Sequence, residues 1–268
     1  MQKINLFSQL PTYESFRDLK HFYALDGMRA IGVVLVIFEH YGGDGLKILS
    51  GWLGVDIFFI ISGFLITTIL LREQEEVGKV SLLDFYIRRA FRILPVYYLV
   101  LAIVIIQTYS MRTYPYGGAE GWNQLQTALP YYLTLFNEQS FGPAPWKLTW
   151  TMGIEWKFYL VWPVVAFILP LGIKKMGLIT TLVVVLLGFS WNVPQVQAAH
   201  YIVLMMGSIM AILLNNKSAF NVLRWLMNPI ASFVLFGCVI AMQLYGIHHL
   251  PSWGGYGGGK EFFVTVLP

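Results

Sequence analysis

The chain has 268 residues, of which 57% are hydrophobic and only 12% are charged, and its apolar residues stand in long runs. This composition excludes a soluble domain of the same length and predicts an all-α fold, a polytopic bundle of transmembrane helices. The net charge of +4 does not indicate nucleic-acid binding, because the basic residues cluster beside apolar segments, where the positive-inside rule accounts for them. The single cysteine, Cys238, excludes an internal disulfide.

The first 24 residues are mixed polar and aromatic, with no uninterrupted apolar run, and we expect no cleavable signal peptide there. We therefore expect a cytoplasmic arm over residues 1–24 and a membrane-embedded domain over residues 25–268. The first helix of that domain is expected to run to about Tyr41. A Gly-rich turn, residues 42–51, then leads into a second helix that is apolar from Gly54 to Leu71.

Charged and titratable residues interrupt these two apolar segments, although a charge at the bilayer centre costs about 3 kcal/mol. Eleven residues separate Arg29 from His40, a spacing that returns within about 20° of the same helical face, roughly 16 Å further along the axis. Glu39 points about a quarter-turn away, and Asp56 is the single charge of the second helix. This region is the predicted site. The alternative is that Arg29 and His40 only mark the two membrane interfaces.

Residues 72–92 are the most charged part of the chain, hold five of its eighteen Lys and Arg residues, and should be cytoplasmic. Within them Arg88, Arg89 and Arg92 stand at i, i+1 and i+4, so that on a helix they lie together. Guanidinium groups at this spacing can grip phosphate oxygens in bidentate fashion. The alternative is a solvated stop signal before a third helix at 93–107.

An exposed loop is expected at residues 112–123, followed by a short apolar segment, 124–136, that either crosses the membrane or only dips into it. Charge counting favours the dip, because a crossing would move four basic residues to the outside: Lys174, Lys175, Lys217 and Arg224. The next block, FGPAPWKLTWTMGIEWKFYLVWP, has the aromatic residues of an interfacial belt. Glu155 lies among them and is the candidate functional group.

Further helices are expected at 158–172, 176–191, 199–214 and 229–247. His248 and His249 are adjacent, cannot share one helical face and have no further ligands nearby, so we predict no metal site. The last apolar run, EFFVTVLP, is too short to span a bilayer and suggests a truncated C-terminus.

Four blocks stand in order along the chain: LDGMRA with the Arg29-to-His40 spacing, GVDIFFIISGF, FYIRRAFRILPVYY and WTMGIEWKFYLVWP. In this combination the chain resembles the acyltransferase family 3 membrane proteins, which O-acylate glycans and other molecules, and the resemblance covers residues 21 to about 163. It implies a bundle of about ten helices, of which about 8 to 9 would be present here. It also implies a multi-pass protein of the bacterial inner membrane, with a cytoplasmic N-terminus and membrane lipids around it.

The resemblance implies transfer of an acyl group, usually acetyl, from cytoplasmic acyl-CoA to a hydroxyl of a glycan, a lipid-linked saccharide or another acceptor. Arg29 and His40 would be the essential pair, and the supporting site residues would be Asp56, Ser62, Arg88, Arg89, Arg92 and Glu155. Two positions depart from the family pattern: Gly153 stands where a serine is usual, and Trp156 stands where a second acid is usual.

Acyl transfer from a thioester to an alcohol requires a base, and an imidazole titrating near neutrality suits that task. His40 is the candidate, either as general base or as a transient acyl carrier. Arg29 would orient the donor, Asp56 or Glu155 would hold the imidazole or neutralise an arginine, and the cluster at 88–92 would hold the phosphates of coenzyme A. Two rival functions are a proton-coupled transporter and an inactive, truncated acyltransferase.

Overall fold

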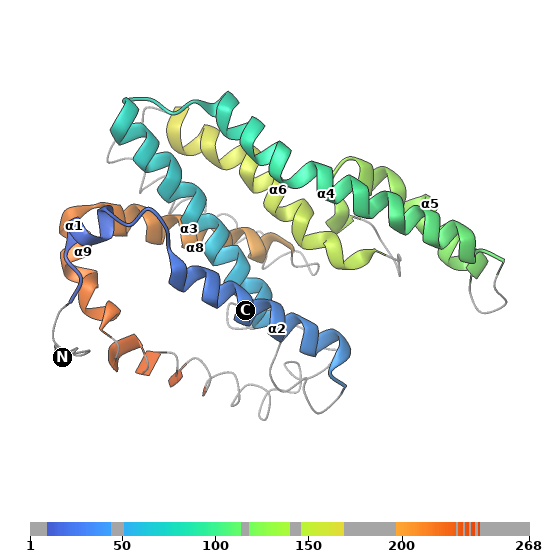
Figure 1. Cartoon of the computed structure of the whole chain (residues 1–268), viewed down its shortest axis with the longest axis horizontal. Coiled ribbons are helices and arrows are strands. Elements are labelled where there is room, and N and C mark those ends of the chain that lie inside the picture. The colour runs from blue at the N-terminus through green and yellow to red at the C-terminus, as the bar shows by residue number, and fades with distance from the viewer. Residues whose placement is uncertain are drawn as a thin grey trace, which may run out of the picture. The chain divides into compact units, whose positions relative to one another are not determined.

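A computed structural model describes residues 10–43, 51–113, 118–139, 146–168 and 197–228, together with residues 230–232, 234–235, 237–238 and 241 (Figure 1). Within these residues the regular elements are helices, which confirms the predicted all-α class. The chain divides into two compact units. Unit 1 comprises residues 1–72 and 179–268, and unit 2 comprises residues 73–178.

In unit 1, α2 (Tyr23–Tyr41) and α3 (Gly51–Val77) form an antiparallel hairpin, and α3 continues from this unit into unit 2. Glycines allow the two backbones to touch: a Cβ on Gly54 would lie 2.5 Å from the carbonyl oxygen of Gly32. At the next contact Gly51 packs against Glu39. The predicted first and second helices are therefore present: α2 ends at Tyr41 as predicted, and α3 extends beyond the predicted apolar stretch at both ends.

The helix α8 (Gln197–Asn215) crosses α3 in the same unit, and is followed by α9 (Lys217–Leu223) and a 3₁₀ turn, Arg224–Met227 (Figure 1). Gly63 and Gly207 make this crossing possible, because a Cβ at either position would collide with the backbone of the other helix. The Ser208 hydroxyl bridges the two helices by donating to the Gly63 carbonyl over 3.3 Å.

The N-terminal arm carries a short helix, α1 (Tyr13–Arg17), that packs onto unit 1. Phe16 is buried in a cluster with side chains of α3, α8 and α9. Arg72, the first residue of the charged end of α3, donates to the carbonyls of Leu19 and Phe16. Glu14 forms an ion pair with Lys217 at 2.9 Å, and that hydrogen bond lowers the pKa of Glu14. The arm is therefore anchored by both apolar and polar contacts.

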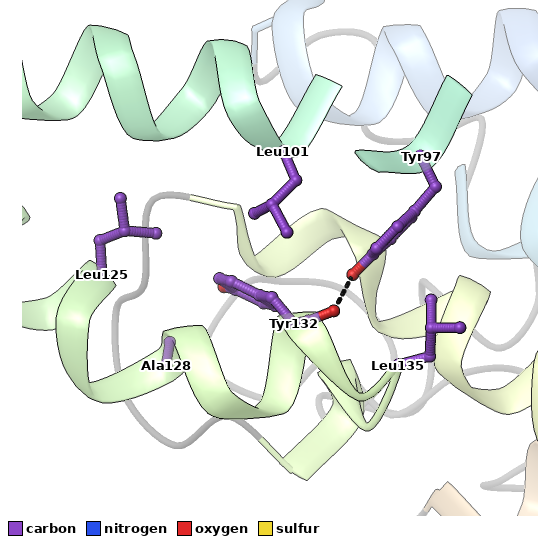
Figure 2. Close-up of a cluster of buried hydrophobic side chains, with 6 residues drawn as sticks. All are labelled: Tyr97, Leu101, Leu125, Ala128, Tyr132 and Leu135. Carbon is purple, nitrogen blue, oxygen red and sulfur yellow. Dashed lines mark hydrogen bonds between the residues drawn. The ribbon is translucent and has the colours of Figure 1, made fainter. Parts of the chain in front are cut away.

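Unit 2 contains α4 (Leu82–Met111), α5 (Gly118–Leu133) and α6 (Trp150–Pro163), which ends in a π-helical turn, Val164–Ile168. Two 3₁₀ turns, η2 (Asn137–Gln139) and η3 (Lys147–Thr149), lie between α5 and α6. Side chains of α4 and α5 point toward each other and form the core shown in Figure 2, where the Tyr97 hydroxyl donates to the Tyr132 carbonyl over 2.8 Å.

Two of the described helices are long and apolar enough to cross a membrane, over Leu53–Val77 and Leu82–Met111. The segments His200–Asn215 and Lys217–Met227 are bent by 105° relative to each other, and would form a third candidate span if they were one broken helix. The helix α5 has 16 residues, fewer than the roughly 20 that a helix needs to span a bilayer. This length is consistent with a segment that only dips into the membrane.

The third helix begins at Leu82 rather than at Ile93, so the arginine cluster lies within α4 instead of preceding it. Arginine is a good helix former, and Ser81 with Asp84 stabilises the start of the helix by a hydrogen bond between their side chains. The predicted helix at 176–191, His248 and His249, and the final run at 261–268 lie outside the described residues, as does most of the segment at 229–247.

Candidate functional site

Arg29 and His40 lie on the same helix, α2, as predicted. Arg29 forms an ion pair with Asp26 one turn earlier, with 3.7 Å between the guanidinium and the carboxylate. Asp26 also contacts the ring of His21 at 2.6 Å. The guanidinium therefore sits in a small charged group at the beginning of α2, while His40 occupies the last turn of the helix.

The His40 ring is fixed by its own helix. Its Nδ1 lies 2.8 Å from the carbonyl oxygen of Val36, and a carbonyl only accepts hydrogen bonds. Nδ1 must therefore carry the proton, which leaves the lone pair of the neutral ring on Nε2. The ring is half-buried. This is the tautomer that a general base or a nucleophile acting through Nε2 requires.

Glu39, the neighbour of His40, has a different partner. Its carboxylate accepts a hydrogen bond of 2.9 Å from the Gly51 amide, the first backbone group of α3. A carboxylate at a helix N-terminus satisfies a free amide and complements the helix dipole. Glu39 therefore ties the turn that carries His40 to the start of α3.

Asp56 and Ser62 are both buried in α3, with exposed fractions of 1% and 7%. The helix contacts α2 through Gly54 and Phe58. Asp56 instead stands three and seven residues before Phe59 and Gly63, which contact α8. By helical periodicity Asp56 faces α8, on the side of α3 away from α2. The His40 ring is accordingly held by the Val36 carbonyl, and Asp56 is not placed to hold it.

In unit 2 the three arginines have different surroundings. Arg88 is 58% exposed and pairs with Glu73 at 3.3 Å. Arg89 lies over the rings of Phe85 and Tyr159, at 5.7 and 5.6 Å from their centroids. Arg92 borders a groove of about 440 Å³ whose other lining residues are mostly apolar: Ile93, Val96, Tyr97, Val100, Trp146, Thr149 and Met152.

Glu155 belongs to the same unit and is linked to the arginine cluster. The Tyr159 hydroxyl, one turn further along α6, donates to its carboxylate over 3.0 Å. Since Arg89 lies over the Tyr159 ring, the predicted carboxylate and one predicted arginine share a tyrosine. The predicted residues thus form two sets, one in unit 1 and one in unit 2, and their convergence on a single site stays a prediction.

Comparison with known proteins decides the family. The model of an acyltransferase domain, that of acyltransferase family 3, matches residues 22–266. The chain belongs to this acyltransferase family. A peptidoglycan O-acetyltransferase of Listeria monocytogenes is 33% identical over 179 residues, which cover 62% of this chain and 27% of that protein. An O-acetyltransferase of Staphylococcus aureus is 32% identical over 189 residues, covering 64% of this chain and 30% of its own length.

A putative O-acetyltransferase of another Staphylococcus aureus strain is 32% identical over 174 residues, or 61% of this chain and 28% of its own length. The chain thus matches less than a third of the length of each of these relatives. No solved structure matches it significantly. All eight predicted site residues lie within the part that the family model matches.

The acyltransferase domain contains a buried ion pair that the sequence motifs did not mark. Glu138, from η2, pairs with Lys157 of α6, and its carboxylate lies against Gly153, where any Cβ would collide with it. Its neighbour Asn137 accepts from Tyr97 over 3.1 Å and donates to Thr149 over 2.7 Å. A glycine in the aromatic block was visible in the sequence, but nothing there indicated which side chain fills the space beside it.

A second missed residue is His200, which is 3% exposed and lies in the first turns of α8. Beyond residue 163 no motif pointed to it. Its only signal was the presence of an imidazole at the start of an apolar helix. Among the described residues no group of three or more His, Cys, Asp or Glu side chains is arranged to bind a metal ion.

Proposed function

We propose that this chain is an integral membrane O-acetyltransferase that moves an acetyl group from cytoplasmic acetyl-CoA to a hydroxyl of a glycan. The observation that carries the proposal is the hydrogen bond between His40 Nδ1 and the Val36 carbonyl, in a chain that belongs to an acyltransferase family. It keeps a basic Nε2 available on a residue embedded in an apolar helix, where an imidazole without a function would be costly.

His40 Nε2 has two chemically consistent uses. As a general base it takes the proton of the acceptor hydroxyl while the oxygen attacks the thioester carbonyl, and returns the proton to the departing thiolate. As an acyl carrier it attacks the thioester itself and expels the thiolate; the acceptor oxygen then takes the acetyl group from Nε2, and the hydroxyl proton goes to the thiolate. Both routes transfer one acetyl group and one proton and need no metal or redox cofactor.

The donor is proposed to bind through its phosphates at the arginine cluster of unit 2. Arg88 and Arg92 are four residues apart on α4 and therefore share one face, with Arg88 well exposed. Arg89 is occupied by the Phe85 and Tyr159 rings and would contribute charge and rigidity. Arg29 is proposed to act on the donor separately from His40, because the two side chains stand about 16 Å apart along one helix.

The proposed acceptor class is supported by the name of a relative. One of them is named for O-acetylation of peptidoglycan, so a glycan hydroxyl of the bacterial cell wall is the proposed acceptor. The basic residues between 72 and 92 favour a cytoplasmic side for that segment, and the contacts of Arg72 with the N-terminal arm favour the same side for the arm. The protein would therefore lie in the bacterial plasma membrane with its N-terminus inside.

The deciding experiment uses the purified full chain in lipid nanodiscs, acetyl-CoA with a radiolabelled acetyl group, and soluble peptidoglycan fragments. The parent should label the glycan, and His40→Ala should lower the rate at least about a hundredfold, as expected for loss of a general base or nucleophile. The matched control is Ile37→Ala, an exposed side chain in the preceding turn of α2, which should keep the rate. Absence of any transfer by the folded parent, or gradient-driven uptake into vesicles without transfer, would refute the proposal.

A further inference from the structure

His200 is a titratable side chain for which the proposed mechanism has no role. It is 3% exposed, and its ring lies against the ring of Phe59 with 5.3 Å between the centroids. Phe59 belongs to the face of α3 that contacts α8, so this contact places the imidazole in the interface between the two helices. The question is what else on that face the imidazole meets.

Three further contacts fix how α3 and α8 are aligned. Gly63 meets Leu204, and Gly207 meets Ile60, in both cases backbone against backbone. The Ser208 hydroxyl donates to the Gly63 carbonyl. Ile60, Gly63, Leu204 and Gly207 mark the crossing point itself. Measured from the Phe59–His200 contact to the Gly63–Ser208 hydrogen bond, residue numbers rise together along the two helices, so the helices run in the same general direction. Their N-terminal ends therefore lie at the same end of unit 1 (Figure 1).

Asp56 stands one turn before Phe59 on the same face of α3 and is 1% exposed. Side chains of α-helices lean toward the N-terminus of their own helix, so the Phe59 ring leans toward the turn of α3 that carries Asp56. The His200 ring contacts the Phe59 ring and therefore lies near that turn. A buried carboxylate needs a hydrogen-bond donor or a positive charge, and an imidazole supplies either.

We propose that His200 is the partner of the Asp56 carboxylate, and that this pair is a positioning element for His40. The route to His40 is short: the pair holds the first turns of α3 against α8, and the first residue of α3, Gly51, is bound by Glu39 next to His40. This role rests on the proposed function of His40. The proposal also gives a role to Asp56, which faces α8 and not His40.

Proximity is tested without any activity. In a Cys238→Ser background, Asp56→Cys combined with His200→Cys should be joined by a short bis-thiosulfonate reagent, detected after cleavage at a protease site inserted at residues 114–117. The matched control is Phe58→Cys with His200→Cys, because Phe58 contacts Gly32 of α2. Equal cross-linking of the two pairs, or none with the Asp56 pair, would overturn the pairing.

The positioning role is tested by the rate of acetyl transfer per molecule that binds acetyl-CoA. His200→Phe fills the space but cannot donate a hydrogen bond. It should lower that rate about tenfold or more, because small displacements of a reacting group are costly. The Kd for acetyl-CoA should change less than about twofold. His200→Gln keeps a donor and should recover most of the rate. Asp56→Asn combined with His200→Phe should be no worse than His200→Phe alone, because the two act as one unit.

A purely structural pair gives a different result. His200→Phe would then reduce the amount of protein that binds acetyl-CoA, while the rate per binding molecule stayed at the parent's value, and the positioning role would be wrong. If the folded parent transfers no acetyl group at all, the proposed function fails, and the cross-linking still decides whether Asp56 and His200 are partners.

Discussion

The charge on Arg88 and Arg92 is expected to serve the donor and not the acceptor. Both guanidinium groups lie on one face of α4, and each phosphate they bind would be gripped by two parallel hydrogen bonds. Replacing both with alanine should weaken acetyl-CoA binding about tenfold to a hundredfold, or about 1.4–2.7 kcal/mol, and leave the KM of the glycan nearly unchanged. Equilibrium binding of acetyl-CoA to the full chain in nanodiscs measures this.

The matched control keeps the charge but removes the planar fork. Arg88→Lys with Arg92→Lys should retain part of the affinity, and what remains should fall more steeply with added salt, because a point charge is more easily screened than a bidentate contact. An alanine variant that binds acetyl-CoA as tightly as the parent would mean that the arginines only mark the cytoplasmic side of the membrane.

At the level of single residues, the sequence was most informative where the argument was local. The eleven-residue spacing of Arg29 and His40 put both on one helix, and α2 has both. Partners that come from distant segments could not be derived. Asp56 looks in the sequence like a companion of His40, but periodicity puts it on the face of α3 that contacts α8, where Phe59 meets His200, 141 residues further along the chain. Glu138 meets Gly153 only because η2 folds back onto α6.

Among the elements, the contact between η2 and α6 depends on a single missing side chain. A Cβ on Gly153 would collide with the Glu138 carboxylate and approach the Leu135 carbonyl oxygen to 3.0 Å. Neither can retreat easily, since Glu138 is held by Lys157 and Leu135 belongs to the buried core (Figure 2). Gly153→Ala should therefore destabilise the protein by about 1–3 kcal/mol, the usual range for overpacking, despite alanine's better helix propensity.

Gly121 of α5 is the matched control, because a Cβ there meets no atom within 4 Å. Gly121→Ala should be neutral or stabilising by up to about 1 kcal/mol, since it removes only backbone entropy of the unfolded chain. Thermal unfolding of the two variants in the same detergent compares them directly. Similar stability of both variants would show that η2 is not held tightly against α6.

Helix boundaries were less predictable than helix existence, for a reason that α4 makes clear. Hydropathy marks the part of a helix that lipid covers, so it placed the beginning of the third helix at Ile93. The backbone continues as a helix for eleven further residues toward Leu82, because charged residues such as Arg88 stabilise helices as well as apolar ones do. The same holds for α3, whose last turn is polar and extends to Val77.

For the whole molecule, the candidate spans over Leu53–Val77 and Leu82–Met111 predict a topology that can be measured. The turn between them is short, carries Lys79 and lies between the charged ends of α3 and α4, so the positive-inside rule predicts that it is cytoplasmic. If the turn is cytoplasmic, α4 carries the chain from the cytoplasm to the outside. Residues just after α4 should therefore lie outside. Lys79 and Thr113 are exposed on these two sides and serve as reporters.

In a Cys238→Ser background, Lys79→Cys should react with a membrane-impermeant maleimide only after the cells are permeabilised, whereas Thr113→Cys should react in intact spheroplasts. Cys238 must be removed because it is exposed and would be labelled itself. The result bears directly on the chemistry. The arginines proposed to bind the donor precede the apolar stretch of α4 and would face the acetyl-CoA of the cytoplasm. Labelling of Lys79→Cys from outside would put these arginines on the opposite side of the membrane from that substrate, and would refute both the orientation and the proposed donor site.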